Sequence, residues 1–75
     1  MDQDLGAALR QFRRRRDVSL RELGAELGIH HSTVARRECG EIGMDRSDLL
    51  EMAAAVERIY ARRAEEMTPA DLLDG

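Results

Sequence analysis

The sequence predicts an all-α domain of five helices, and two observations lead to this prediction. Apolar residues recur every three or four positions along nearly the whole chain, and no alternating run of β-branched or aromatic residues is long enough for a strand. Signals that start and stop helices divide this pattern into segments. At 75 residues the chain fits one domain, residues 1–75, close to the lower limit for independent folding.

The first helix is expected from Asp4 to Arg16. Acidic residues stand at its N-terminal end and arginines at its C-terminal end, as the helix dipole favours. Asp17 follows where the helix needs a left-handed terminator, a conformation that Asp tolerates better than most residues. The 3.6-residue period places on the core face Leu5, Ala8, Leu9 and Phe12.

The second helix is expected over Leu20 to Leu27. Ser19 and Glu22 form the S-x-x-E pattern of a capping box at its start. Gly28 ends it, because glycine readily adopts the left-handed conformation that terminates helices. Its inner face consists of Leu20, Leu23 and Leu27.

A third short helix begins after Ile29 and His30 and stops at Gly40. Two short helices joined by about three residues match the helix-turn-helix motif, here over residues 20–39, whose second helix enters the DNA major groove. Val34 points inward, and His31 stands at the N-terminal flank that meets base edges in this motif. The outer face carries Ser32, Ala35, Arg36 and Cys39.

A long fourth helix is expected over residues 46–66, after a loop at 41–45. At 1.5 Å per residue it reaches about 30 Å, so three short helices cannot cover it and its second half needs another surface. Thr68 and Pro69 predict a fifth helix of one turn. One stripe of mostly apolar residues follows the fourth helix at three- and four-residue spacing, and it consists of Leu49, Ala53, Val56, Tyr60, Arg63 and Met67. The stripe is widened by Leu50, Met52 and Ile59.

Charge is segregated along the chain. Residues 1–37 hold eight arginines and five acidic residues, a net charge of +3, whereas residues 38–75 hold four arginines and ten acidic residues, a net charge of −6. A basic half can therefore meet phosphate while the acidic half faces elsewhere. All 12 basic residues are arginine, and with ten alanines this suggests a GC-rich bacterial or phage source.

The chain resembles the Cro/C1-type, Xre-like helix-turn-helix proteins over nearly its whole length. The resemblance lies in "LGAALRQFRRRRDVSLRELGAELGIHHSTVARRECGE" and, less closely, in "SDLLEMAAAV" and "TPADLL". It implies a lambda-repressor-like fold and a transcriptional regulator, with repression favoured over activation, that binds a palindromic operator in double-stranded DNA as a homodimer.

The resemblance also implies roles for particular residues. The base-reading positions fall on His31, Ser32 and Arg36, of which Arg36 is suited to a bidentate contact with guanine. A structural ion pair common in the family falls on Arg13 and Glu38. Candidate phosphate contacts are Arg10, Arg14, Arg15, Ser19, Arg21, Thr33 and Arg37. The arginines of the run 13–16 could instead be a solvated surface that favours the helix dipole.

The sequence departs from the family pattern in three places. Leu20 stands where a phosphate-binding glutamine is usual, so that contact is lost or falls to Ser19 and the helix amides. Arg37 stands at a usually apolar position and either snorkels past the core or extends toward DNA. The long fourth helix is interpreted as a dimerisation device, although it could fold back on its own domain. The expected interface is Val56, Ile59, Tyr60, Arg63 and Met67.

Other functions fit the sequence less well. The runner-up is a protein-interaction module on the same fold, such as an antitoxin or an anti-activator. No catalytic constellation recurs, so an enzyme is not expected. Adjacent residues of a helix point in different directions, so His30 and His31 are not expected to bind a metal together. No other cofactor and no small-molecule ligand is expected. Cys39 cannot pair within the chain, and with no secretory leader or membrane span the expected location is the cytoplasm.

Overall fold

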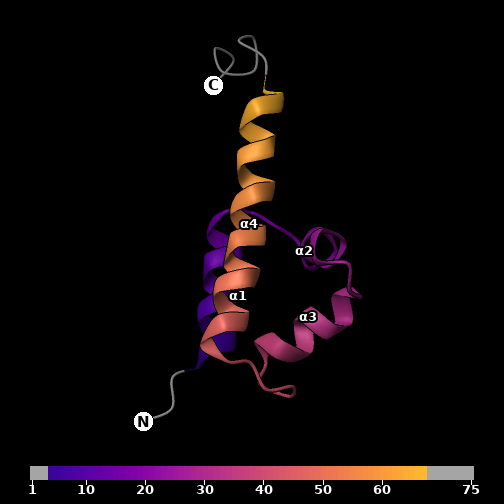
Figure 1. Ribbon diagram of the computed structural model, residues 1–75. Coiled ribbons are helices and arrows are strands. Elements are labelled where there is room, and N and C mark those ends of the chain that lie inside the picture. The colour runs from indigo at the N-terminus through magenta and orange to yellow at the C-terminus, as the bar shows by residue number, and fades with distance from the viewer. Residues whose placement is uncertain (1–3, 68–75) are drawn as a thin grey trace.

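The computed structural model describes residues 4–67, and in these residues it has four α-helices and no strand. They are α1 (Leu5–Arg15), α2 (Leu20–Leu27), α3 (His31–Glu38) and α4 (Arg46–Glu66), labelled in Figure 1. The all-α prediction is confirmed. The fifth helix expected from Thr68 lies outside the described residues, so the predicted count of five is not supported.

Local sequence signals set the helix ends. The side chain of Asp4 caps α1 by accepting from the Ala7 amide at 3.0 Å, and Asp17 takes the left-handed conformation expected after α1, with φ 54°. Both halves of the capping box at the start of α2 are present, and Gly28 ends α2 at φ 73°. A second capping box, between Asp45 and Asp48, starts α4.

One large side chain from each helix forms the centre of the core. Leu9, Leu23, Val34 and Val56 come from α1, α2, α3 and α4 and are completely buried. On α1 the buried face differs from the expected stripe, because Ala8 is exposed while Gly6 and Arg13 are buried. The rest of the core consists of Val18, Met52, Ala55 and Ile59.

Gly6 allows α1 and the end of α3 to approach closely. A Cβ atom at this position would lie 2.4 Å from the carbonyl oxygen of Glu38 and 2.5 Å from that of Arg37. Only glycine fits such a backbone contact without displacement. The C-terminal end of α3 is therefore fixed against the first turns of α1.

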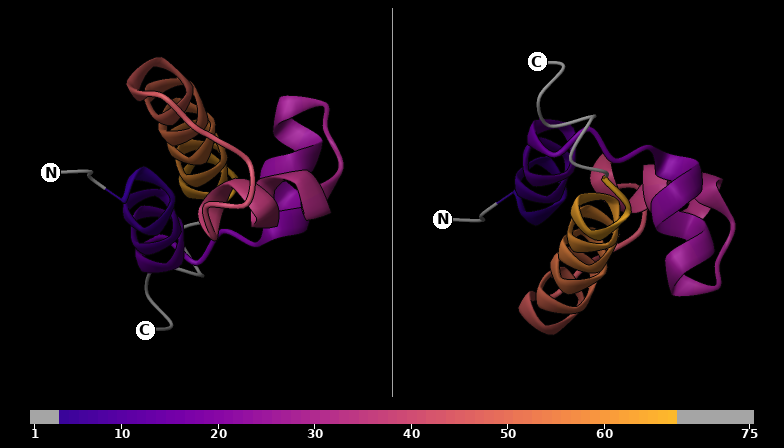
Figure 2. Two further views of the ribbon diagram at one scale, coloured as in Figure 1. Left: turned by 90° about the horizontal axis from the view of Figure 1, so that it is seen from below. Right: turned by 90° about the horizontal axis from the view of Figure 1, so that it is seen from above.

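Helix α4 stands beside α1, with α2 and α3 on one side of the pair, and its C-terminal part extends past the other helices (Figures 1 and 2). Its buried residues are Met52, Ala55, Val56 and Ile59. Val56 is fully buried and Ile59 is 5% exposed, so the prediction that they form a dimer interface is wrong. They face the domain's own core because α1 and α2 pack along this side of α4.

Within the described residues no helix is sufficiently long and apolar to cross a membrane.

Candidate nucleic-acid interface

The turn between α2 and α3 is tight because two glycines permit it. Gly28 adopts the left-handed conformation, and the Ile29 amide donates to the Gly24 carbonyl at 2.9 Å. A Cβ atom on Gly24 would lie 2.8 Å from the carbonyl oxygen of Ile29, so a larger residue would push the turn away from α2. The turn thus fixes the start of α3 against α2.

The two faces of α3 have different surroundings. Val34 is fully buried and Glu38 is 3% exposed, and they lie one turn apart on the inner face. Ser32 and Arg36 are exposed. Because residues four apart on a helix differ by about 40° in direction, these two side chains share one outer face. We call Ser32 and Arg36 the outer face of α3.

Three further residues, in α3 and at its C-terminal cap, border this outer face. Thr33 and Ala35 are partly exposed, and Cys39 is exposed at the helix end, where its thiol lies 3.4 Å from the Arg36 carbonyl. Together with the outer face, these residues form a short and accessible strip of mostly polar side chains, as an element that enters a DNA groove must have.

Arg36 is the cation of the outer face. Its side chain is 59% exposed, and its Nε lies 3.9 Å from a carboxylate oxygen of Glu41 in the loop after α3. An exposed ion pair at this distance contributes little free energy. The guanidinium can therefore exchange Glu41 for a better acceptor at low cost.

The N-terminal end of α3 is built from two stacked histidines. The rings of His30 and His31 lie 4.3 Å apart between centroids, and Nδ1 of His30 accepts from the Ser32 amide at 3.1 Å, which caps the helix. His31 is only partly exposed. Burial, followed by the nearby charge of Arg21, lowers the pKa of His31 below its usual value. His31 therefore sits at the border between α3 and Arg21 of α2, beside the outer face.

The base of α3 is held by a buried ion pair. Arg13 donates from Nε and Nη2 to the two carboxylate oxygens of Glu38, at 2.7 and 2.8 Å, so the contact is bidentate. Its Nη1 donates to the Val18 carbonyl at 3.0 Å. Arg10 approaches the same carboxylate at 3.5 Å. This pair joins α1 to α3, and it removes Arg13 from the groups available to DNA.

The remaining arginines of the run after Arg13 have separate roles. Arg16 stacks on the Phe12 ring at 3.6 Å and pairs with Glu57 of α4 at 3.2 Å. Arg14 and Arg15 are exposed. The four consecutive arginines thus do not form one basic patch, since successive helical residues point about 100° apart.

The other candidate phosphate contacts differ in availability. Arg21 is exposed on the first turn of α2 and lies close enough to His31 to lower its pKa, which places Arg21 beside the start of α3. Arg10 is half-buried near Glu38. The Ser19 amide is bonded to Glu22, so this residue offers only its hydroxyl hydrogen.

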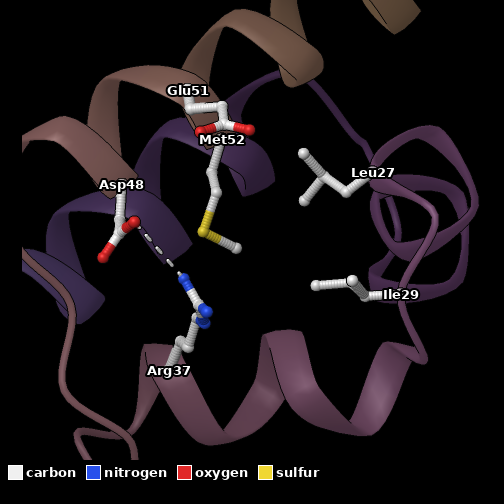
Figure 3. Close-up of a pocket in the computed structure, with 6 residues that line it drawn as sticks. All are labelled: Leu27, Ile29, Arg37, Asp48, Glu51 and Met52. Carbon is white, nitrogen blue, oxygen red and sulfur yellow. Dashed lines mark ion pairs between the residues drawn. The ribbon is translucent and has the colours of Figure 1, made fainter.

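Arg37 does not point toward the outer face, and its prediction as a phosphate contact is wrong. Its side chain crosses from α3 toward α4, where Nη1 lies 3.8 Å from Asp48 (Figure 3). Its Nε is buried without a hydrogen-bond partner. Of the two directions that the sequence left open, the side chain takes the inward one. It lines a pocket of about 160 Å³ together with Leu27, Ile29, Asp48, Glu51 and Met52.

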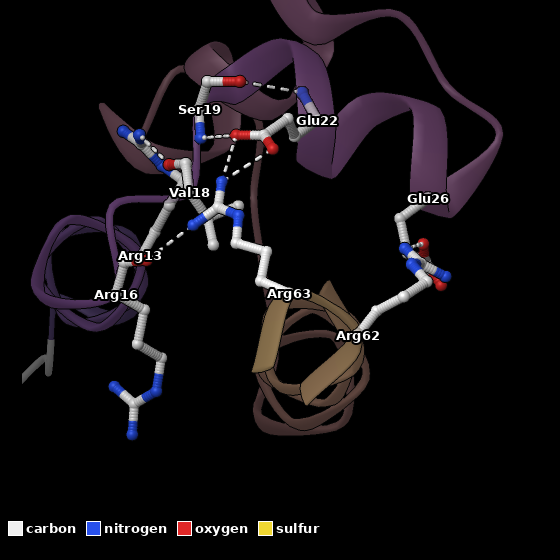
Figure 4. A network of polar contacts seen from close by, with 8 residues as sticks. All are labelled: Arg13, Arg16, Val18, Ser19, Glu22, Glu26, Arg62 and Arg63. Carbon is white, nitrogen blue, oxygen red and sulfur yellow. Dashed lines mark hydrogen bonds and ion pairs between the residues drawn. The ribbon is translucent and has the colours of Figure 1, made fainter. Parts of the chain in front are cut away.

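A second polar network ties the C-terminal half of α4 to α2. Arg63 donates to Glu22 at 2.6 Å and to the Arg16 carbonyl at 3.0 Å, and Arg62 contacts Glu26 (Figure 4). Arg58 contacts Glu26 as well. The Ser19 amide and then Arg63 hold the pKa of Glu22 below 4.5, and Arg62 and Arg58 do the same for Glu26. The guanidinium of Arg63, a residue of the expected dimer interface, is therefore engaged within the chain.

Beyond this network an apolar groove is left between the end of α1 and α4. Its volume is about 290 Å³. Tyr60 and Met67, from the expected interface, line it and are each 51% exposed. The other lining residues are Arg16, Asp17, Arg63 and Ala64.

Two structural roles were not predicted from the sequence. His30 caps α3 and contacts Ser32, and Gly6 permits the contact between α1 and α3. The position of His30, directly before a helix and two residues before a serine, is the only local sign of the first role. The second depends on a contact between distant segments, which no local pattern reveals.

Comparison with known proteins places this geometry in a family. No curated protein and no solved structure matched the chain. A family model described as a helix-turn-helix domain matches residues 4–65. That range contains all four helices except the last residue of α4, and such domains are typically DNA-binding and non-enzymatic. The chain accordingly belongs to the family of helix-turn-helix domains.

Proposed function

We propose that this protein is a sequence-specific DNA-binding regulator of the Cro/C1 type, with a lambda-repressor-like domain that lays the outer face of α3 in the major groove. The observation that carries the proposal is the division of α3. Val34 and Glu38 fasten the helix to the domain, while Ser32 and Arg36 project away from it. Side chains placed in this way can reach base edges without any rearrangement of the fold.

Arg36 and Ser32 are the principal base-reading residues in this proposal. A guanidinium can donate two parallel hydrogen bonds to O6 and N7 of guanine, the commonest specific contact in the major groove. His31 takes a secondary role at the edge of the groove, because it is only partly exposed. Specificity then rests mainly on Arg36.

Phosphate contacts come from residues that flank α3. Arg14, Arg15 and Arg21 are exposed and are assigned to the DNA backbone, with Arg10, Thr33 and the Ser19 hydroxyl as weaker contributors. Such contacts orient the protein on the duplex but do not read sequence. They should make the affinity fall steeply with salt concentration.

We further propose a homodimer on a palindromic operator, with an interface that differs from the one expected from the sequence. The surface available to a second copy is the apolar groove around Tyr60, Ala64 and Met67. A two-fold contact there buries both exposed stripes at once. The operator half-sites would then be centred about one DNA turn apart. Repression is favoured over activation, because occupation of an operator is by itself enough to block it.

Selection of DNA from a random pool, followed by titration at two salt concentrations, tests the proposal. We expect a palindrome, and we expect Arg36→Ala to weaken binding to it by about 1 to 3 kcal/mol and to relax one base position. Arg14→Ala should weaken binding to all sequences alike and reduce the salt slope by about one. An unchanged operator affinity in Arg36→Ala would refute the assignment of Arg36 to base reading.

A protein-interaction module is the second candidate function. The apolar groove beside Tyr60 favours it, as does Glu41, which places an acidic side chain 3.9 Å from the Arg36 guanidinium. This alternative predicts no salt-dependent binding to DNA, and it predicts a protein partner that occupies the groove. The same titration therefore separates the two candidates.

A further inference from the structure

The hydrogen bonds at the start of α3 fix the protonation state of His30. The Ser32 amide points at Nδ1 of His30, at 3.1 Å. An amide N–H can only donate, so Nδ1 must carry a lone pair. A neutral imidazole with a bare Nδ1 has its proton on Nε2.

The same nitrogen determines what the Ser32 hydroxyl can do. Oγ of Ser32 lies 2.8 Å from Nδ1 of His30. Since Nδ1 has no proton to give, a contact this short requires the hydroxyl to donate its only hydrogen, so the amide and the hydroxyl share the single lone pair of Nδ1. A hydroxyl has one hydrogen and two acceptor lone pairs, so Ser32 retains acceptor capacity alone.

The neighbouring ring supports this arrangement. His31 stacks on His30 with an interplanar angle of 30°, which holds the His30 ring in the plane that both Ser32 contacts require. Burial lowers the pKa of His31, which favours a neutral partner in the stack. Two neutral rings can stack without repulsion between charges.

We propose that His30 makes Ser32 an obligate hydrogen-bond acceptor, so that Ser32 selects a base with an exposed amino group: adenine through N6 or cytosine through N4. This inference rests on the proposed function, because it takes the outer face of α3 to lie in the major groove. In that groove the amino groups of adenine and cytosine are the base-edge donors, whereas guanine and thymine present only acceptors. An unconstrained serine would accept either class.

The inference also places the selected base. Ser32 and Arg36 share the outer face and are one helical turn apart, about 6 Å along the axis. Base steps along one strand are about 3.4 Å apart. The donor base should therefore lie within about two steps of the base pair whose guanine Arg36 contacts.

Two measurements on the whole chain test the inference, and the first needs no DNA. Long-range proton–nitrogen NMR correlations at neutral pH report which ring nitrogen of His30 carries the proton. We expect a bare Nδ1 and a protonated Nε2. A protonated Nδ1 would overturn the inference directly.

The second measurement uses DNA selected by the wild-type protein. We expect adenine or cytosine at the Ser32 position, and replacing a selected adenine by purine, which lacks the amino group, should weaken binding about three- to ten-fold, the effect of one neutral hydrogen bond. If cytosine is selected, the cytosine-to-thymine change, which turns the donor into an acceptor, should cost at least as much. Selection of guanine or thymine, or equal binding to the altered site, would overturn the inference.

His30→Ser supplies the matched variant. Serine is a good helix N-cap, so α3 should stay capped, but a serine hydroxyl can donate as well as accept and no longer dictates the Ser32 proton. The variant should bind the operator and tolerate guanine or thymine at this position, while Cys39→Ser, on the same side of α3, should keep the wild-type preference. Identical preferences in His30→Ser and wild type would contradict the inference.

If neither the wild-type protein nor any variant selects DNA, the proposed function fails and the inference fails with it. This result is distinct from DNA binding without the donor preference, which contradicts the inference alone.

Discussion

At the scale of single residues, the buried pair of Arg13 and Glu38 determines where α3 sits. Both side chains are almost fully buried, and the bidentate contact satisfies both carboxylate oxygens. Arg13→Met leaves the Glu38 carboxylate buried without its main partner, which costs about 3 to 5 kcal/mol. Total stability in a domain this small is of similar size. Urea unfolding should therefore show a variant that is largely unfolded or close to it.

A double substitution is the control for this prediction. Arg13→Met combined with Glu38→Leu removes both charges and fills a similar volume, so stability should return to near the wild-type value. If Arg13→Met alone is as stable as wild type, the pair contributes nothing to the free energy that holds α3 against α1.

Arg37 is a second residue whose surroundings predict a measurable effect. Its Nε is buried without a partner, and the pocket around it is partly lined by Leu27, Ile29 and Met52. Arg37→Leu removes the unsatisfied donor and adds apolar contacts, so we expect the free energy of unfolding to rise by about 1 kcal/mol. Arg14→Leu, at an exposed position, should change it by less than about 0.5 kcal/mol. A destabilised Arg37→Leu would show that the Asp48 contact matters more than the orphan donor.

How far these residues can be predicted from the sequence depends on the range of the interaction. Ser19, Asp17 and Gly28 were predicted because caps and left-handed terminators act within a few residues. The direction of Arg37 was left open because it depends on Asp48 in another helix. His30 was missed because its ring is usually interpreted as a ligand or a surface group, and not as a cap.

At the scale of secondary-structure elements, α4 separates what sequence patterns can and cannot predict. Its bounds, 46–66, were predicted correctly because the helical period is continuous across them. Its inner face was predicted only in part, since apolar residues occur on more than one side. The structure buries Met52, Ala55, Val56 and Ile59 and exposes Leu50 and Tyr60. The choice between these stripes is made by α1 and α2, which no pattern within α4 encodes.

The tether between α2 and the C-terminal half of α4 should depend on pH. Hydrogen bonds and arginines lower the pKa of Glu22 and Glu26 below 4.5 in the folded chain. The stabilisation is thus present above 4.5 and is lost as the pH falls through the folded-state values. Amide hydrogen exchange should show α4 beyond Arg58 opening first on acidification. Protection in this segment that is unchanged at acid pH would contradict the prediction.

The control for the tether is the pair of substitutions Glu22→Gln and Glu26→Gln. They remove both titrating groups, so the protection factors in the second half of α4, which are corrected for the intrinsic exchange rate, should become nearly independent of pH in the acid range. Because Glu22 and the three arginines are between 36% and 54% exposed, high salt should weaken the tether in the wild-type chain as well.

At the scale of the whole molecule, the remaining question is what covers the apolar groove beside Tyr60 and Met67. In the proposed dimer these side chains meet their counterparts on a second copy, and two outer faces of α3 then reach one palindrome.

Tyr60→Asp should introduce a charge into that contact, and the variant should sediment as a monomer. The variant should lose about 100-fold or more in affinity for the palindrome, because the second half-site contact is no longer tethered to the first. Its affinity for an isolated half-site should be unchanged, since Tyr60 lines the groove between α1 and α4 and takes no part in the outer face of α3. Leu50→Asp, at an apolar and exposed position elsewhere on α4, is the matched control and should remain dimeric. A Tyr60→Asp variant that still sediments as a dimer would rule out this groove as the interface, whereas a wild-type chain that is monomeric on its operator would rule out the dimer altogether.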